Sequence, residues 1–235
     1  MPKSQKSFLA PKLYFWAIMG LMMAALVLGF FSPQAGLAQG AQSQAQDWAA
    51  ADFKDGDILL QAVDTFQTLA LTLATGSQYT HTGVVYWRDG QVFVYEALAN
   101  VTLTPMAVFV ARAKGDLLQY RLKDPSLITG QALAKMIEVG NVFDGKPYDF
   151  KFLWSDEQIY CSELVYKIYQ RGLGLELVPL RPFKDYDLTH PVVKALIEKR
   201  FGQNPPLGEL AVAPADFLNS PYLTLAGRIK GGQNP

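Results

Sequence analysis

The segment HTGVVYWRDGQVFVYEAL, from His81 to Leu98, decides the fold that we predict for this chain. Two apolar runs flank Asp89-Gly90, a pair that is favoured in two-residue type I′ turns between antiparallel strands. Counting outward from this turn places Gly83 opposite Glu96. The sequence therefore predicts a hairpin in which His81 and Glu96 share one face, one diagonal step of about 7–8 Å apart, with the side chain of Gly83 absent between them.

Strands and helices alternate on both sides of this hairpin. Further strands are expected within Asp55–Ala62, Asn100–Thr104 and Asp116–Leu122, and helices over Asp64–Gly76, Pro125–Gly140, Cys161–Gly172 and Thr189–Gly202, with a short helical turn in Ala213–Leu223. The expected fold class is α+β, with a mostly antiparallel sheet.

The N-terminus has the pattern of a secretory signal. Three lysines precede an apolar run from Leu13 to Phe31, and small residues follow it. Cleavage is expected near Ala38, with Ala45 as a second candidate. The apolar run is long enough that an uncleaved membrane anchor is the alternative. Either reading predicts a periplasmic or secreted protein.

After residues 1–38, the chain divides into a polar linker at 39–51, one domain at 52–226 and a tail at 227–235. The expected domain is long enough for a hydrophobic core of its own. Three of the 21 basic residues lie before Ala38 and none of the 21 acidic residues does, so the remainder has three more acids than bases. Such a balance argues against a nucleic-acid partner.

Cys161 is the only cysteine, and it stands at the expected start of a helix in the segment IYCSELVYKI. A lone cysteine is often a buried packing residue. Exported proteins, however, use cysteine mostly in disulfides, and this one has no partner in the chain. A thiol at a helix N-terminus meets unsatisfied N–H groups and partial positive charge, which favour the thiolate. We therefore interpret Cys161 as a nucleophile.

The two histidines differ in their surroundings. His190 precedes a proline at a helix start, and we interpret it as a surface or capping residue. His81 has a carboxylate on its own face, and a buried histidine with a satisfied ring is the alternative reading. A histidine beside a thiol forms a thiolate–imidazolium pair, and a carboxylate fixes its tautomer. We expect Cys161, His81 and Glu96 to act in these three roles.

A metal or cofactor site is not expected. One cysteine, one well-placed histidine and scattered carboxylates do not form a tetrahedral site, and neither HExxH nor CxxC spacing occurs. The chain also lacks the GxxxxGK[ST] phosphate loop and the GxSxG nucleophile elbow.

The segments GDILL, ATGSQYTHTGVVY, VYEA and YCSELVYKIY, in this order, resemble the circularly permuted NlpC-type papain-like cysteine hydrolases, in particular their YiiX-like group. The resemblance extends over Asp55–Tyr169, and VAPADFLNS resembles the segment that closes such domains. It implies a permuted papain-like core, in which a sheet with His81 and Glu96 packs on the helix that begins at Cys161. Hydrolysis or acyl transfer at a carbonyl, through a thioester, is the implied chemistry.

The substrate stays open among small molecules, peptides and lipids. An amidase of peptide or cell-wall bonds is the first hypothesis, a lipid-directed acyl hydrolase or acyltransferase the second, and a non-catalytic binding module the third. Tyr148 and Trp154 belong to an aromatic alternation that predicts either a core strand or an apolar wall beside the thiol. Tyr160 either shapes the oxyanion pocket or only packs. We expect these three residues to be substrate-binding, and any membrane contact to involve only the N-terminal segment.

Overall fold

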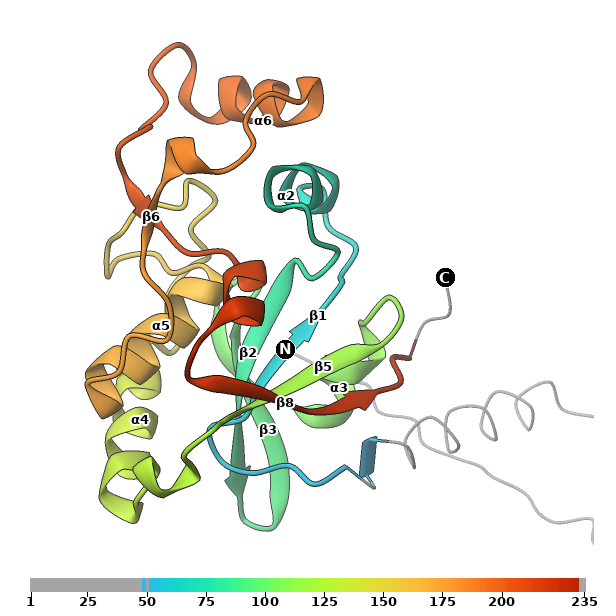
Figure 1. Cartoon of the computed structure of the whole chain (residues 1–235), viewed down its shortest axis with the longest axis vertical. Coiled ribbons are helices and arrows are strands. Elements are labelled where there is room, and N and C mark those ends of the chain that lie inside the picture. Colours follow the sequence, from blue (N-terminus) through green and yellow to red (C-terminus); the bar gives the residue numbers. More distant parts are fainter. Residues whose placement is uncertain (1–47, 50, 233–235) are drawn as a thin grey trace, which may run out of the picture.

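The computed structural model describes residues 48–49 and 51–232, so the expected signal segment and most of the linker lie outside the described residues. A six-stranded sheet in the order β4-β3-β2-β1-β5-β8 forms the centre of the α+β fold, and every neighbouring pair is antiparallel (Figure 1). The strands are β1 (Ile58–Gln61), β2 (His81–Arg88), β3 (Gln91–Ala97), β4 (Val101–Pro105), β5 (Leu117–Leu122) and β8 (Leu223–Ile229). No helix among the described residues is long and apolar enough to span a membrane.

The predicted hairpin is confirmed. Both turn residues have positive φ, 50° at Asp89 and 74° at Gly90, as a type I′ turn requires. The register pairs Gly83 with Glu96. A Cβ atom at Gly83 would lie 2.6 Å from the carbonyl oxygen of Tyr95, so only glycine allows β2 and β3 to approach here.

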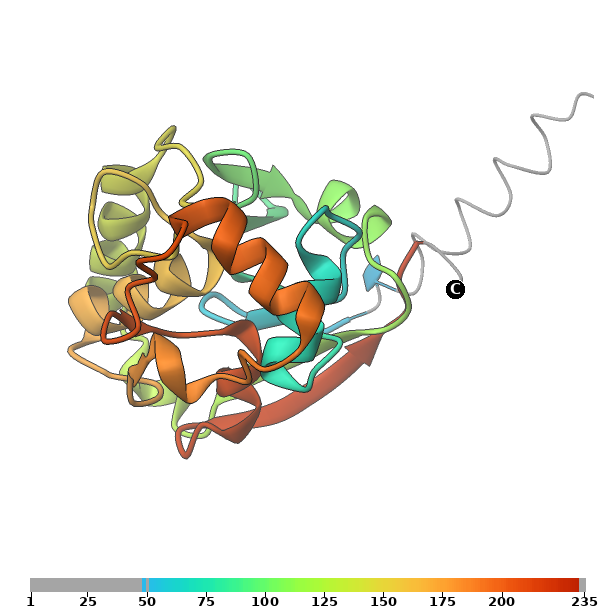
Figure 2. The same ribbon diagram turned by 90° about the horizontal axis from the view of Figure 1, so that it is seen from above.

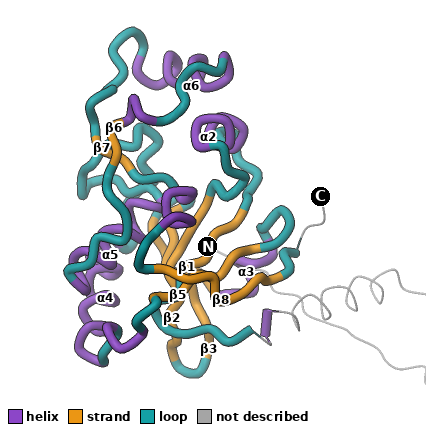
Figure 3. Tube along the Cα trace, viewed as in Figure 1, coloured by secondary structure: helices purple, strands orange, loops and turns teal. Residues whose placement is uncertain are grey.

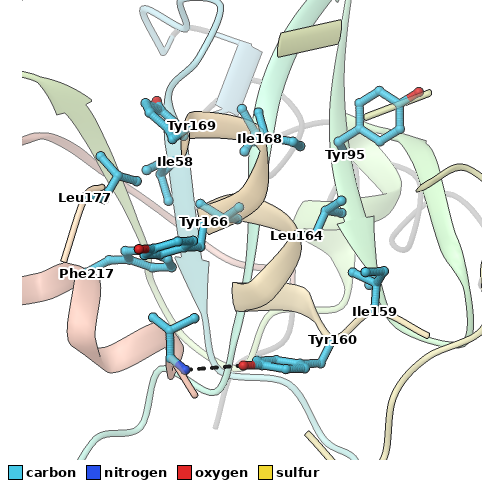
Figure 4. Packing of buried hydrophobic residues seen from close by; sticks show 14 of the residues in the cluster. Ile58, Tyr95, Ile159, Tyr160, Leu164, Tyr166, Ile168, Tyr169, Leu177 and Phe217 are labelled. Carbon is cyan, nitrogen blue, oxygen red and sulfur yellow. Dashed lines mark hydrogen bonds between the residues drawn. The ribbon is translucent and has the colours of Figure 1, made fainter. Parts of the chain in front are cut away.

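Helices cover both faces of the sheet. On one face, α4 (Gly130–Phe143) and α5 (Cys161–Leu173) pack in a core with alternate residues of β2 and β3, among them Val84 and Tyr95 (Figure 4). On the other face, α3 (Met106–Ala111) packs against Val85. This division follows from the period of two in a strand, which sends successive side chains to opposite faces.

A third group of elements lies beyond one end of the sheet (Figures 1 and 3). It contains α2 (Thr68–Thr75), α6 (Pro191–Phe201), the short strands β6 (Arg181–Pro182) and β7 (Leu210–Ala211), and the 3-10 helix η2 (Phe183–Asp185). The 3-10 helix η3 (Pro214–Asn219) instead lies beside β8, and its Phe217 packs in the core with α5. Seen from above, α6 runs beside α2 (Figure 2). The remaining short helix, η1 (Pro125–Leu127), precedes α4.

Several element boundaries differ from the expectations. The helix expected from Asp64 begins at Thr68, and its apolar stripe is partly exposed, since Phe66 and Leu69 are 71% and 59% accessible. The helix expected from Pro125 begins at Gly130, where the Thr129 side chain accepts a hydrogen bond from the Ala132 N–H.

Strand β8 was not anticipated as an element. It pairs with β5 up to Ile229, so residues 227–229, assigned above to the tail, belong to the sheet.

The core strand considered for the aromatic alternation is wrong. Residues 148–154 form an irregular loop in which Phe152 has φ 56°, a value that a strand does not allow. The carboxylate of Asp149 stabilises this conformation, because it accepts hydrogen bonds from the N–H groups of Lys151 and Leu153 at 2.7 and 2.6 Å. The aromatic side chains of residues 148–154 therefore do not lie along one side of the segment, as they would in a strand.

Candidate active site

Cys161 is the first residue of α5, and its thiol is free and buried. Tyr160, the residue before it, has extended backbone dihedrals, as is usual for an N-cap residue, so the helix begins at the cysteine. The Glu163 carboxylate accepts a hydrogen bond from the Tyr160 N–H at 3.3 Å, as expected for an acid in the first turn. The next residue, Ser162, donates a hydrogen bond from its hydroxyl to the Val212 carbonyl at 2.7 Å.

His81 contacts both other members of the expected triad. Its Nε2 lies 2.6 Å from Oε2 of Glu96, and its ring is close enough to Cys161 for the cysteine to raise the pKa of the histidine. The other ring nitrogen, Nδ1, is the one left for the sulfur. Helix α5 packs on the opposite face from Glu96, but His81 is the first residue of β2. Its ring can therefore reach both groups around the end of the sheet.

Arg112 is a residue that sequence reasoning missed. It follows α3 directly, and its Nη2 bonds Oε1 of Glu96, which leaves Oε2 for His81. Its side chain is 30% exposed while that of Glu96 is fully buried. The order Arg112–Glu96–His81–Cys161 thus runs from the α3 side of the sheet to the start of α5.

These contacts shift the pKa values of both titratable residues of the sheet. Burial alone would lower the pKa of His81, but its hydrogen bonds with Cys161 and Glu96 raise that pKa to about 9. Burial likewise opposes ionisation of Glu96, yet His81, Arg112 and Thr104 together lower its pKa to about 2. At neutral pH the ring is therefore a cation and the carboxylate an anion, the charge states that an ion pair with a thiolate needs.

A largely apolar cavity opens beside Cys161. Its walls come from α2, α6, the segment before η3 and the 148–154 loop, and its empty space is about 720 Å³, including the part open to solvent. Tyr148, Phe152 and Tyr160 line it together with the cysteine. Elements from the end of the sheet therefore form one continuous surface with the thiol.

The three residues expected to bind substrate occupy different places. Tyr148 lines the cavity together with Cys161, which helps raise the pKa of the Tyr148 hydroxyl, and this hydroxyl accepts a hydrogen bond from Gln67 Nε2 at 3.1 Å. Tyr160 packs edge-on against Phe152, and its hydroxyl accepts a hydrogen bond from the Val212 N–H at 3.3 Å (Figure 4). Trp154 does not belong to the cavity lining.

Trp154 instead packs against a second buried charge cluster, which sequence reasoning also missed. Lys167 of α5 lies with its Nζ 5.0 Å from the centre of the Trp154 ring. The same Nζ bonds Glu163 at 2.6 Å, Asp156 at 2.8 Å and the Ser155 carbonyl. This cluster joins the loop that follows Tyr148 to the helix of the nucleophile.

His190 caps α6, since its Nδ1 accepts a hydrogen bond from the Val192 N–H at 3.2 Å, as expected. Among the residues that the structure describes, no three His, Cys, Asp or Glu side chains are grouped so that they could hold a metal ion.

Comparison with known proteins supports the resemblance found in the sequence. Residues 52–226 match the family described as permuted papain-like amidase enzyme, YaeF/YiiX, C92 family. The chain is 36% identical over 174 residues to protein YiiX of Escherichia coli strain K12, an alignment that covers 74% of this chain and 85% of YiiX. A crystal structure of YiiX from Escherichia coli O157:H7, titled a metalloprotein, matches with a TM-score of 0.71 at 35% identity, over 77% of this chain and 98% of that one. This chain belongs to the YaeF/YiiX family of permuted papain-like amidases.

Proposed function

We propose that this protein is an exported cysteine amidase that cleaves an amide bond of peptide or cell-wall type through a thioester with Cys161. The observation that carries the proposal is the contact of His81 with both Cys161 and Glu96, at a thiol that borders a cavity. A cysteine that only packed would need neither an imidazolium nor a carboxylate behind it.

The first half of the reaction forms the thioester. The Cys161 thiolate attacks the carbonyl carbon, and the negative charge moves to the carbonyl oxygen. The N–H groups in the first turn of α5 and the Tyr148 hydroxyl are the donors beside the sulfur that can stabilise this oxyanion. His81, as the cation, then donates a proton to the leaving nitrogen, and the C–N bond breaks.

The second half regenerates the enzyme. His81 is now neutral and accepts a proton from water, whose oxygen attacks the thioester carbon. The C–S bond breaks, the acid leaves and the thiolate forms again beside the imidazolium. Glu96 holds the ring through Nε2 in both halves, so the same nitrogen faces the sulfur throughout.

A lipid-directed acyl hydrolase or acyltransferase is a second candidate, because one observation favours it. The cavity beside Cys161 is lined mainly by aliphatic and aromatic residues of α2 and α6. Such a wall suits an acyl chain as well as an apolar side chain. The chemistry at Cys161 stays the same, and in a transferase an alcohol or amine acceptor replaces water.

The decisive experiment compares wild-type protein with Cys161→Ala on two substrate sets, peptidoglycan fragments and phospholipids, with the products identified by mass. The thiol is nearly enclosed and alanine is smaller, so we expect the variant to fold and to lose all turnover and all labelling by thiol-directed acyl probes. Release of peptides or amines supports the amidase, and release of fatty acids supports the second candidate. Labelling that persists in the variant would contradict a role for Cys161 as the nucleophile, and turnover of neither set would favour a non-catalytic binding module or a substrate outside both sets.

Export is part of the proposal and has its own test. The apolar run Leu13–Phe31 lies outside the described residues, so the support for export is its sequence pattern. Expression of the full chain in a bacterium, followed by fractionation and intact mass, should give periplasmic protein cleaved near Ala38 or membrane-bound protein of full length. A cytoplasmic protein with an intact N-terminus would contradict export.

A further inference from the structure

Arg200, in the last turn of α6, differs from everything else in the cavity wall. Among the described residues it is the only one with a charged side chain that lines the cavity beside Cys161. A guanidinium in an apolar wall is unfavourable unless some group compensates its charge. A group that compensates the charge of Arg200 is therefore expected nearby.

No side chain of the described part of the chain fully compensates this charge. Arg200 donates one hydrogen bond, from Nη2 to the amide oxygen of Gln67 at 2.6 Å, and stacks over Phe152 at 5.0 Å. No carboxylate among the described residues lies within ion-pair distance of it. Asp149 acts on it from farther away, but its oxygens accept N–H groups of its own loop. Burial lowers the pKa of Arg200 below its ordinary value, as expected for a cation without an anion at hand.

A second polar group in the same wall also lacks a partner. Thr80 lines the cavity and is 5% exposed, and its buried hydroxyl has no hydrogen-bond partner among the described residues. Thr80 immediately precedes His81. Buried polar groups are nearly always satisfied in proteins, so an unsatisfied hydroxyl beside a catalytic histidine indicates that a ligand group completes it.

Arg200 also lies close to the reacting atoms. Its hydrogen bond to Gln67 continues through that amide to the Tyr148 hydroxyl, which itself contacts Cys161. Arg200, Tyr148 and Cys161 also line the same cavity. An anion bound at Arg200 would therefore share that cavity with a carbonyl carbon under attack at Cys161.

We propose that Arg200 binds a carboxylate of the substrate, so that the preferred substrate is an amide with an apolar group in the cavity and a free carboxylate near the scissile bond, as in an N-acyl amino acid or an apolar peptide C-terminus. This inference rests on the proposed function, because it uses Cys161 as the attacking group. Guanidinium is suited to this role, because its planar N–H groups match a carboxylate in a bidentate pair.

Alkylation of Cys161 tests the inference without a known substrate. The reagents are two matched pairs, iodoacetate with iodoacetamide and 2-bromooctanoate with 2-bromooctanamide. In each reaction the sulfur forms a bond to carbon, and the halide leaves with the electron pair of the carbon–halogen bond. The measured quantity is the rate of the acid divided by the rate of its amide, which cancels changes in the reactivity of the thiol itself.

The variants are Arg200→Gln, Arg200→Lys and, as a matched control, Arg88→Gln, which removes a positive charge from the exposed end of the β2–β3 hairpin. We expect the acid-to-amide ratio to fall about tenfold in Arg200→Gln, less in Arg200→Lys, and not at all in Arg88→Gln. The fall should be larger for the octanoyl pair, whose chain enters the cavity.

The outcomes distinguish failure of the role of Arg200 from failure of the proposed function. An equal ratio in wild type and a folded Arg200→Gln variant would overturn the role of Arg200 while leaving the proposed function intact. If that variant does not fold, an unchanged ratio in Arg200→Lys for both pairs would overturn it instead, because lysine loses the bidentate geometry. Failure of all four reagents to alkylate Cys161 in folded wild-type protein would contradict the proposed function itself, and the inference with it.

Discussion

Two buried glutamates lie near Cys161, one on the sheet and one on the helix, and their pKa values move in opposite directions. Burial is the largest influence on each and raises both, since neither side chain has any exposed surface. Nevertheless the pKa of Glu96 is lowered to about 2, while the pKa of Glu163 is raised to about 7. The difference must come from their partners.

The two acids differ in how many cationic side chains they contact. Glu96 has Arg112 on one oxygen and His81 on the other. Glu163 has only Lys167, and Lys167 is shared with Asp156. A surplus of positive charge keeps the sheet acid ionised, whereas a shared cation does not outweigh burial on the helix acid. Glu96 thus stabilises the cationic form of His81, whereas Glu163 belongs to a cluster that joins α5 to residues 155–156.

The largest expected effect tests the structural side of this comparison. Lys167→Met removes the buried cation and leaves Glu163 and Asp156 without it, which should lower the free energy of unfolding by about 3 kcal/mol. Arg171→Gln is the matched control, because Arg171 bonds the same Asp156 from a more exposed position, and should change stability by less than about 1 kcal/mol. Urea unfolding measures both. Equal losses would show that the cluster is no more important than a surface ion pair.

The next effect tests the catalytic side. Glu96→Gln removes the negative charge that favours a cationic His81, so the pKa of His81 should fall and alkylation of Cys161 by iodoacetamide at pH 7 should slow about 100-fold. Glu163→Gln serves as the control, and its rate should stay within about threefold of wild type. If the two substitutions slow the thiol equally, the proposed division between the two acids is wrong.

A smaller effect is expected one residue farther from the sulfur. Arg112→Gln leaves Glu96 with His81 alone, which should raise the pKa of Glu96 and slow alkylation about tenfold at pH 5, with less effect at pH 7. Arg112→Lys keeps the charge and should recover part of the rate. A loss that is the same at both pH values and not recovered by lysine would mean that Arg112 acts through packing.

The hairpin, with His81 and Glu96 on one face, and the start of a helix at Cys161 could be predicted because they depend on local rules, whereas the approach of Cys161 to His81 was implied only by the family resemblance. A type I′ turn fixes its register, and from that register the shared face of His81 and Glu96 follows by counting. The position of Cys161 followed from helix signals around it. These arguments need no knowledge of how distant segments pack.

The charge clusters could not be predicted, because they depend on distant packing. Arg112 meets Glu96 across 16 positions, after a short helix that the sequence pattern did not indicate. Lys167 looks like a solvated lysine four residues after Glu163, and only the loop folded over it makes it buried.

The strand considered for residues 148–154 was wrong for a different, local reason. Alternating aromatic residues indicate a strand, but the two N–H groups bonded by Asp149 hold Phe152 at a positive φ.

The last expected effect is gradual, a pH dependence of stability that has opposite sign for the two glutamates. In the unfolded chain both acids lose their proton near pH 4.5, but in the folded chain Glu163 keeps it until about pH 7. Between these values the folded state binds more protons, so stability falls as pH rises, by at most about 1.4 kcal/mol per pH unit.

Glu96, with its lowered pKa, contributes stability above pH 4.5 that is lost only as the pH falls toward 2. His81, with its raised pKa, contributes stability below pH 6.5 that is lost as the pH rises toward 9. The contributions of Glu96 and His81 therefore change mainly outside the window from pH 4.5 to 6.5, and comparison with Glu163→Gln removes the effect of other groups. The free energy of unfolding in urea should be measured at pH 4.5, 5.5 and 6.5. As the pH rises, wild type should lose stability steadily relative to Glu163→Gln. A difference that stays flat, or that shifts in favour of wild type, would mean that Lys167 does keep Glu163 ionised and that the two acids are held alike.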